Sequence, residues 1–517
     1  MSYFGFRKIA AIANAHGVHV AIHVIMPTAM RSLRIILRGN DSHADYTDDD
    51  IEQIAQTLAG YELLAVSSMS REAYLVKRIL TALHARASRP FLLWGGIHPT
   101  ISPLDALDSH ADAICLGEGE MAFAEFLENF HDQEARLTTR NFWFRTPGGV
   151  QRNPQRSLAT SAELESLPFP LYGQKEYLYR QGEGFQPIVN FDYLDSEAMA
   201  YNTVWTRGCP FKCTYCSNST FLKLDRNYAK VRHASIDHLI AEIRLIQAQR
   251  PYLRSVTFHD DCFMALEPQY LRAFADQWRQ KVNLPFCVLG LTPIHVDEEK
   301  MAILVSAGMN RVRMGIQSGS DRILKFYKRP SRPGLIQSAT AAIARHARFM
   351  VAPSYDIIVD NPIETSQDIL ATVRLVNDLP RPFTLSIFSL RTIPYTELEQ
   401  QLESVAASGT NMMEGNYLVC APTFGNILLY CSAIMRIPPA LLNRCAQHVH
   451  PAHCGPRALP GLLMMVKLLF FTQRAFQHLR QWDFSVVFGR LGWVLWRCSL
   501  LPSPSAGAAR KWWSIKK

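Results

Sequence analysis

The sequence lacks a secretory leader and any apolar run long enough to cross a membrane. The first residues, from Met1 to Lys8, do not begin an extended apolar segment of the kind found in signal peptides. Later apolar stretches are interrupted by Lys467, Arg490 and Arg497, and none reaches about 18 uncharged residues. We therefore expect a cytoplasmic protein without a spanning helix.

Two further absences argue against a nucleic-acid-binding protein and a disulfide scaffold. The chain has 54 Lys and Arg against 45 Asp and Glu, but no sustained basic patch interleaved with aromatic residues. Eight of its 11 cysteines are scattered without a regular spacing, which is typical of reduced thiols. The net charge of +9 fits a membrane surface or an anionic cofactor better than nucleic acid.

The composition itself is that of a folded protein with a substantial core. Hydrophobic residues make up 48% of the chain and charged residues 19%, which excludes a disordered protein. A length of 517 residues is enough for more than one domain.

Three cysteines differ from the other eight because they lie within eight residues. Cys209, Cys213 and Cys216 are spaced C-x3-C-x2-C, directly after a β-prone run at 202–206. Such a loop can direct three thiolates to one iron–sulfur cube and leave the fourth iron open. A structural zinc site would need a fourth ligand at short spacing, and His233 lies seventeen positions beyond Cys216. The spacing favours a 4Fe–4S cluster over zinc or over three unrelated core cysteines.

At these positions the chain resembles the radical S-adenosylmethionine (radical SAM) enzymes, whose signature is C-x3-C-x-aromatic-C with Tyr215 as the aromatic residue. The resemblance implies that S-adenosylmethionine binds the open iron. One electron from the cluster would then cleave it to a 5′-deoxyadenosyl radical. It also implies that Phe211 and Tyr215, within the same loop, contact S-adenosylmethionine.

Residues 1–135 are predicted to form a separate α/β domain. Buried-type strands at 63–68, 91–94 and 113–116 alternate with helical segments, which is typical of a doubly wound parallel sheet. An additional strand is expected at 18–25. Ligands bind such sheets beyond the carboxyl ends of the strands. The candidates there are Ser67, Ser68, Gly95, Gly96, Gly117 and Gly119.

Two of these turns resemble signatures of the cobalamin-binding subgroup of radical SAM enzymes. The segments at 95–100 and 117–120 match G-G-x-H-P-T and G-E-G-E. The resemblance implies cobalamin at the serine and glycine turns. The motif D-x-H-x-x-G is absent, so His98 is interpreted as a structural turn residue and no histidine is assigned to cobalt.

Residues 196–397 predict a partial βα barrel, and residues 136–195 are expected to be a linker. Strand and helix patterns alternate from the cysteine loop to a last strand at 384–390. In such barrels the chemistry takes place at the carboxyl ends of the strands.

Polar residues at these strand ends are the candidates for S-adenosylmethionine binding. Gln317 and Ser318 match the family stretch G-[IV]-[EQ]-S-G, which implies a contact with S-adenosylmethionine. Asp260 and Asp261 follow a strand and fit either ribose or ammonium binding or an acidic helix start. Arg313 can pair with the methionine carboxylate or form an ordinary salt bridge.

The last region, residues 398–517, is predicted to be mainly helical. Its apolar segments carry Lys, Arg and Trp, which suits helices at a membrane interface or a lid over an apolar substrate. The alternative is a helical cap on the barrel. Peripheral membrane contact through this region is therefore one of the partner interactions that the sequence leaves open.

The resemblance as a whole implies a radical SAM enzyme that uses cobalamin to methylate an unactivated carbon of a small-molecule or lipid-like substrate. Such an enzyme needs an electron donor such as flavodoxin or ferredoxin. Two alternatives stay open. One is a radical oxidoreductase, cyclase or rearrangement enzyme without methyl transfer, and the other is a non-catalytic iron–sulfur redox or scaffold protein.

Overall fold

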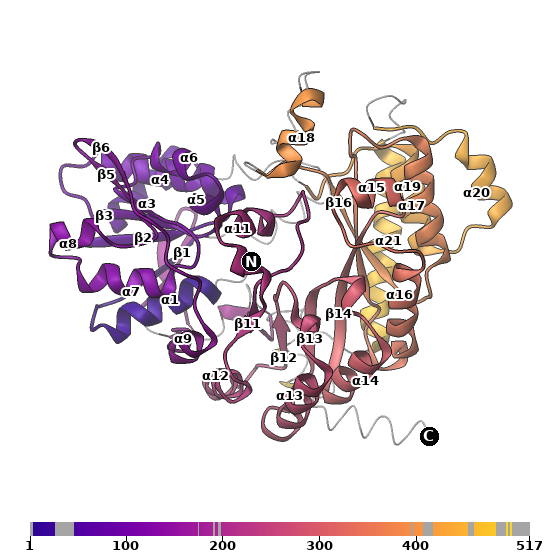
Figure 1. Cartoon of the computed structure of the whole chain (residues 1–517), viewed down its shortest axis with the longest axis horizontal. Coiled ribbons are helices and arrows are strands. Elements are labelled where there is room, and N and C mark those ends of the chain that lie inside the picture. The colour runs from indigo at the N-terminus through magenta and orange to yellow at the C-terminus, as the bar shows by residue number, and fades with distance from the viewer. Residues whose placement is uncertain are drawn as a thin grey trace.

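Two α/β domains and a layer of C-terminal helices follow one another along the chain and lie side by side in that order (Figure 1). The structure is a computed structural model. It describes residues 4–25, 46–173, 175–189, 192–194, 198–393, 396–406, 417–452, 460–481, 493–494 and 497–498.

The N-terminal domain is built on a five-stranded sheet in the order β2-β3-β4-β5-β6. The first three strands are parallel, and the last two form an antiparallel hairpin. The strands are β2 (Leu63–Ser67), β3 (Phe91–Gly95), β4 (Ala113–Cys115), β5 (Phe142–Thr146) and β6 (Gly149–Arg152). The helices are α1 (Phe4–Ala15), α3 (Asp48–Leu58), α4 (Ala73–His84), α5 (Ile97–Ile101), α6 (Pro103–Leu107), α7 (Glu120–Glu128), α8 (Gln133–Leu137) and α9 (Ser161–Ser166).

Both faces of this sheet are buried, as the predicted doubly wound arrangement requires. Successive residues of a strand point to opposite faces. Leu92 and Trp94 accordingly pack in a core with α3 and α4, while Leu93 packs in a second core with α1 and α7. The prediction of a parallel α/β domain at the N-terminus is confirmed.

The segment expected to be a linker contains strands of two sheets. β5 and β6 lie within 136–195 and complete the N-terminal sheet, so the sheet extends past the predicted domain end at residue 135. β1 (Ile22–Val24) pairs with β7 (Glu176–Arg180), which also pairs with β8 (Gly184–Pro187). The strand expected at 18–25 therefore belongs to a small separate sheet. The pairing of β1 with β7 joins positions far apart in the sequence, so local patterns do not reveal it.

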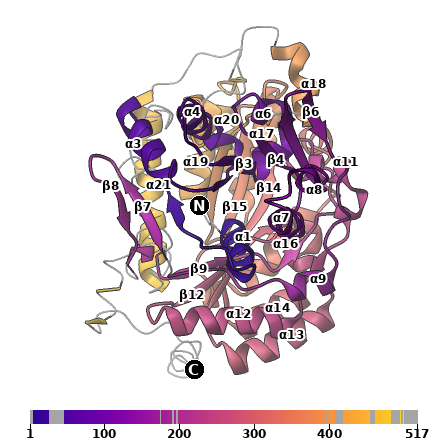
Figure 2. The same ribbon diagram turned by 90° about the vertical axis from the view of Figure 1, so that its left-hand side faces the viewer.

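The second domain is a sheet of six parallel strands in the order β16-β15-β14-β13-β12-β9, which confirms the predicted partial βα barrel. The strands are β9 (Ala200–Thr203), β12 (Ser255–Phe258), β13 (Phe286–Leu291), β14 (Met309–Gln317), β15 (Ser354–Val359) and β16 (Thr384–Ser389). The helices are α11 (Asn218–Leu224), α12 (Ile236–Gln249), α13 (Pro268–Lys281), α14 (Glu298–Ala307), α15 (Asp321–Phe326), α16 (Leu335–Arg345) and α17 (Ser366–Asp378). In both views α12, α13 and α14 lie together along one edge of the molecule (Figures 1 and 2).

The C-terminal region is helical, as predicted, and part of it extends the barrel core. The helices are α18 (Glu397–Ala406), α19 (Phe424–Ile434), α20 (Pro439–Ala446) and α21 (Pro460–Gln481). α19 packs on α17, and α21 packs on α19, with its buried residues in the same core as the barrel strands. None of the helices in the described ranges is long and apolar enough to cross a membrane. Most of the apolar segment at 486–501 lies outside the described residues.

Candidate active site

The loop that carries the three cysteines, residues 208–217, is called the cluster loop. A short antiparallel pair, β10 (Thr206–Arg207) with β11 (Arg232–His233), leads into it. Gly208 has φ of 110°, and a Cβ there would lie 2.4 Å from the carbonyl oxygen of Lys230. Only glycine permits both this conformation and this approach. Further along, the backbone N–H of Thr214 donates to the carbonyl oxygen of Tyr327 at 3.0 Å, so the loop is fixed on both sides.

The three cysteines lie on this one loop but do not surround a single point. Cys209 and Cys213 are buried and Cys216 is partly buried. Among the described residues, no three Cys, His, Asp or Glu side chains are placed to hold one metal ion. A zinc site needs such a placement, whereas each cysteine of a 4Fe–4S cube binds a different iron. The assignment of the three cysteines to a cluster stays a prediction of their spacing.

A buried arginine lies beside the cluster loop. Arg329 donates from Nη2 to the carbonyl oxygen of Gly315 at 2.7 Å, and its Nη1 is 3.7 Å from Sγ of Cys213. Burial lowers the pKa of Arg329, but the neighbouring Tyr215 hydroxyl and Cys213 thiol raise it above its ordinary value. The guanidinium thus stays charged next to groups that become thiolates. Sequence reasoning missed Arg329 because 116 positions separate it from Cys213.

A fourth cysteine, outside the motif, also contacts the loop. The Sγ of Cys262, which follows β12, lies 3.7 Å from Sγ of Cys209, and both side chains are buried. The hydrogen bond from Cys262 lowers the pKa of the Cys209 thiol. Burial raises the pKa of Cys216 to about 12. No spacing rule in the sequence singles out Cys262, so it could be found only from the fold.

Asp260 and Asp261 lie close to the cluster loop, and protein groups donate hydrogen bonds to both side chains. Asp260 accepts hydrogen bonds from the backbone N–H groups of Trp205 and Thr206 at 3.0 and 2.7 Å. Asp261 accepts one from the hydroxyl of Tyr228 at 3.0 Å. Burial raises the pKa of Asp260 to about 7. Both residues therefore position the loop, and a contact with S-adenosylmethionine stays a prediction.

Gln317, at the end of β14, has a buried side-chain oxygen that a ligand could contact. Its φ is 73°, next to an irregular register between β14 and β15. The side-chain Oε1 is buried without a hydrogen-bond partner in the described residues. A Cβ on Gly315 would lie 2.4 Å from Nε2 of Gln317, so the glycine leaves room for this side chain. A buried acceptor without a donor costs about 1–3 kcal/mol, which a donating ligand such as an ammonium group would recover.

Ser318 and Arg313, the other candidates on this strand, already have protein partners. The hydroxyl of Ser318 lies 3.1 Å from Oγ1 of Thr372, and it accepts a hydrogen bond from the N–H of Ser320. Arg313 donates from Nε to Oδ1 of Asp356 at 2.7 Å, which is the salt bridge considered as its alternative role. Of these three residues, Gln317 is the one that offers an unused acceptor.

The two aromatic residues of the cluster loop pack into different apolar clusters. The ring of Phe211 lies 5.4 Å from the ring of His295, centroid to centroid. The ring of Tyr215 meets that of Tyr327 edge to face at 5.1 Å. Both rings therefore anchor the loop, and their predicted contacts with S-adenosylmethionine stay predictions.

The polar turns of the N-terminal sheet meet as predicted at the carboxyl ends of β2, β3 and β4. We call this set of residues, which comprises Ser67, Ser68, Gly95, Gly96, Gly117 and Gly119, the serine–glycine edge. Gly96 has φ of 96°, and a Cβ there would lie 2.8 Å from Oγ of Ser67. Thr100 donates to the carbonyl oxygen of Gly96 at 2.8 Å and accepts from the N–H of Gly117 at 3.0 Å. The Trp94 indole N–H also donates to Oγ of Ser68 at 3.0 Å, so the edge is held by main-chain contacts and by two neutral side chains.

His98 is a structural residue of this edge, in agreement with its interpretation from the sequence. Its Nε2 lies 2.9 Å from Oδ2 of Asp105, and its ring stacks on Trp94 at 4.9 Å. The side chain is buried, which lowers its pKa. Its Nδ1 lies 3.3 Å from Oγ of Ser70, so both ring nitrogens have protein partners, which fits a structural role.

Two glutamates join the serine–glycine edge to the cluster loop. Glu118 accepts from both terminal nitrogens of Arg232 on β11, at 2.7 and 3.1 Å. Glu120 pairs at 2.6 Å with Arg207, the residue directly before Gly208. Burial opposes the charge on Arg207, but Glu120 raises the pKa of this guanidinium overall. These buried ion pairs fix the two sites next to each other, and the sequence did not reveal them.

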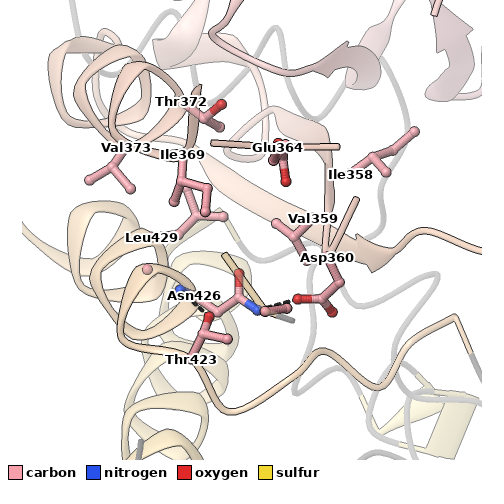
Figure 3. A pocket seen from close by; sticks show the side chains of 12 residues that line it. Ile358, Val359, Asp360, Glu364, Ile369, Thr372, Val373, Thr423, Asn426 and Leu429 are labelled. Carbon is pink, nitrogen blue, oxygen red and sulfur yellow. Dashed lines mark hydrogen bonds between the residues drawn. The ribbon is translucent and has the colours of Figure 1, made fainter. Parts of the chain in front are cut away.

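A separate buried carboxyl lies behind the barrel, between α17 and α19. Glu364 lines a cavity of about 20 Å³ together with Asp360 and Asn426, whose side chains hydrogen-bond at 2.8 Å (Figure 3). Burial and the nearby Asp360 raise the pKa of Glu364 to about 8. The cavity has room for one water and belongs to neither of the sites above.

Two family models match the chain, and each covers most of the strands of one of the two large sheets. The B12 binding domain matches residues 2–127, and the Radical SAM superfamily matches residues 203–376. Together they account for more than half of the chain, in the order in which the serine–glycine edge and the cluster loop occur.

Similar proteins include two curated methyltransferases. An uncharacterized methyltransferase of Pyrococcus horikoshii is 24% identical over 322 residues, which is 61% of this chain and 63% of the relative. Cytidylyl-2-hydroxyethylphosphonate methyltransferase of Streptomyces wedmorensis is 25% identical over 379 residues, 67% of this chain and 66% of the relative. The match thus spans less than two thirds of the length of either relative.

A solved structure shows the same fold. It is the radical S-adenosylmethionine methyltransferase TsrM of Kitasatospora setae with cobalamin and a [4Fe-4S] cluster bound. The TM-score is 0.59 at 15% identity, and the alignment covers 80% of this chain and 73% of TsrM. The paired domains are therefore a known architecture.

Proposed function

Because the chain belongs to the cobalamin-binding radical SAM enzymes, we propose that it transfers a methyl group to an unactivated carbon of a small-molecule or lipid-like substrate. The carrying observation is that the two ion pairs, Arg207–Glu120 and Arg232–Glu118, hold the cluster loop against the serine–glycine edge. When bound, the cluster and cobalamin supply an electron for cleaving S-adenosylmethionine and a methyl group for transfer. Both groups must act on one substrate, so their sites have to face a common space.

The cluster loop supplies three cysteine ligands, and Arg329 beside it supplies a positive charge. Cys209, Cys213 and Cys216 would each hold one iron. Arg329 places a fixed positive charge beside Cys213, which stabilises the thiolate form. Cys262 donates a hydrogen bond to the sulfur of Cys209. Both contacts come from side chains outside the cysteine motif, so the fold around the loop helps to set the positions of Cys213 and Cys209.

Gln317 is the residue of this chain best placed to orient S-adenosylmethionine. Its unpartnered Oε1 accepts a hydrogen bond, as the ammonium group of the methionine moiety requires. The positive φ of Gln317 and the irregular register beside it set the direction of its side chain, and Gly315 leaves room for that side chain. Since glutamine carries no charge, it holds the ligand through hydrogen bonding alone.

The serine–glycine edge suits a large planar ligand that approaches the backbone closely. Glycines at 95, 96, 117 and 119 leave the ends of two strands, β3 and β4, with little side-chain bulk. Ser67 and Ser68 add hydroxyl groups at the same edge. With His98 held by Asp105, this edge would bind cobalamin without providing a histidine to cobalt. The electron for the cluster would come from a separate donor such as flavodoxin or ferredoxin.

Anaerobic purification and reconstitution test the proposal. The protein is produced with cobalamin, reconstituted with iron and sulfide, reduced, and incubated with S-adenosylmethionine. We expect a corrinoid spectrum, an iron–sulfur spectrum and release of 5′-deoxyadenosine. The Cys213→Ala variant is expected to lose the cluster and turnover, whereas Cys445→Ser, in α20, keeps both.

The possible results separate the open alternatives. Formation of 5′-deoxyadenosine without a bound corrinoid would exclude methyl transfer by cobalamin and favour another radical reaction. A cluster that never promotes cleavage of S-adenosylmethionine would leave a redox or scaffold protein.

A further inference from the structure

Helix α21 has two apolar faces, and only one of them packs on the protein. Leu463, Val466 and Phe470 are buried in the barrel core. Phe470 contacts Tyr430 of α19 at 5.4 Å between ring centroids. This face accounts for the helical cap that the sequence left as one alternative.

The second face is exposed to solvent. Four of its side chains are 47–55% exposed, and a fifth, Phe476, is 66% exposed. With 3.6 residues per turn, their positions fall on the side of the helix opposite Val466 and Phe470. We call this set the apolar stripe: Met464, Met465, Leu468, Leu469 and Phe476. The end of α19 continues it, because Gln473 donates to the carbonyl oxygen of Ile434, next to the exposed Met435.

The charge of this part of the chain is strongly one-sided. Residues 415–517 contain 12 of the 54 Lys and Arg but only one of the 45 Asp and Glu, Asp483. The remaining 414 residues hold 42 basic and 44 acidic side chains and are close to neutral. The whole positive excess of the protein therefore lies in the region that carries the apolar stripe.

This charge selects among the partners that could cover the stripe. A second copy of the chain would bring two strongly basic regions together, which costs free energy through repulsion. An anionic surface gains attraction from the same charges. Five of the nine tryptophans also fall in this region, at 482, 493, 496, 512 and 513. Tryptophan is the residue type enriched where a protein meets the lipid headgroups.

We propose that the C-terminal region docks this protein onto an anionic lipid bilayer, with the apolar stripe of α21 in the interface. An exposed apolar helix face within a strongly basic region suits an interfacial helix on an anionic surface. The contact is peripheral, since no helix in the described part of the chain can span a bilayer. It is independent of the radical chemistry, because the stripe shares no residue with the cluster loop or the serine–glycine edge.

Vesicle flotation of the full-length holoprotein tests this docking. Vesicles of phosphatidylcholine with phosphatidylglycerol are compared with vesicles of phosphatidylcholine alone, at low and high salt. We expect binding to the anionic vesicles only, and weaker binding at high salt. The double variant Leu468→Glu/Leu469→Glu should bind at least about tenfold less, because two apolar side chains are lost from the interface.

The matched control carries the same two charges elsewhere on the surface. Leu104→Glu/Leu245→Glu changes exposed leucines on α6 and α12 and should bind like the unmodified protein. Equal loss in both double variants, or binding that ignores lipid charge, would overturn the proposal. A dimer that is detected by light scattering and is disrupted only in the stripe variant would also overturn the proposal. If the stripe variant does not fold, the unmodified protein still tests the proposal. Its tryptophan emission must then shift to shorter wavelength on addition of the anionic vesicles but not of phosphatidylcholine vesicles.

Discussion

The cluster loop is held mainly by side chains and charges, whereas the serine–glycine edge is held mainly by main chain. Arg329, Cys262 and Asp260 all reach the cluster loop or the strand that leads into it. At the other site most partners are backbone N–H and carbonyl groups, joined by a few neutral side chains: the Thr100 hydroxyl, the Trp94 indole on Ser68 and the Asn141 amide on the Glu118 carbonyl oxygen. In the proposed function, the first site prepares thiolates to bind metal, and the second leaves out side chains so that a large ligand can approach. Single substitutions should therefore disable one site and spare the other.

The largest effect is expected from Gly208→Ala. The added methyl would lie 2.4 Å from the Lys230 carbonyl oxygen, so the loop must move and the cysteines with it. We expect iron content near background while the corrinoid is retained, as measured by iron and cobalt analysis of the same sample. Gly182→Ala is the control, because φ there is also positive but nothing lies within 4 Å. Retention of iron in Gly208→Ala would contradict this account of the loop.

The reciprocal change is Gly96→Ala. Its Cβ would lie 2.8 Å from Oγ of Ser67 and 2.9 Å from the carbonyl oxygen of Ser68. The serine–glycine edge must then distort, so we expect corrinoid content to fall severalfold while the iron content stays unchanged. Gly173→Ala serves as the control, since it shares a positive φ but has open space. A parallel loss of iron would show that the two sites are not separable.

A smaller effect is expected where the two sites are joined. Glu120→Gln removes one partner of the buried Arg207–Glu120 ion pair and leaves the guanidinium without its counter-charge. Breaking a buried pair in this way typically costs about 3–5 kcal/mol. Denaturant unfolding should show that loss, and both cofactors should bind more weakly. Glu299→Gln, which breaks the exposed pair with Arg272, should change stability by less than about 1 kcal/mol.

The smallest effect on cofactor binding is expected at Glu364, which belongs to neither site and should change stability alone. Its pKa is about 8 in the folded protein, against 4.5 as its ordinary value, so the folded state holds a proton that the unfolded state releases. Its contribution to stability is therefore complete below pH 4.5 and is lost as the pH rises to about 8, by up to about 1.4 kcal/mol per pH unit. Glu364→Gln should flatten the fall in Tm between pH 6 and pH 8. An unchanged slope would show that Glu364 ionises normally.

Several elements could be predicted because their signals are local. The strands expected at 63–68 and 91–94 are β2 (Leu63–Ser67) and β3 (Phe91–Gly95), each within one residue of its expected end. The three cysteines, the two glycine turns and Gln317 were found because their spacing or motif lies within a few residues. His98 was interpreted correctly as structural, although the sequence did not identify Asp105 as its partner.

Other elements could not be predicted, since their partners are distant in the chain. Within 136–195 the turn at 146–149 indicates the hairpin of β5 and β6, but not the pairing of β5 with β4 or of β7 with β1. Arg329 and Cys262 stand in no motif, yet the fold places both beside the cluster loop. Asp260 had the residue type of a ligand, but the fold occupies both of its oxygens.

The sequence by itself determined the chemistry available to this protein: three thiolates with one open iron, a ligand edge rich in glycine, and a basic C-terminus. These features depend on residue type and short spacing, which do not change on folding. The tertiary structure alone decided how they are arranged. It placed the edge beside the loop through Arg207–Glu120 and Arg232–Glu118, and it turned one apolar face of α21 outward. Charge pairing and burial act through space, so only the folded chain determines which residues meet.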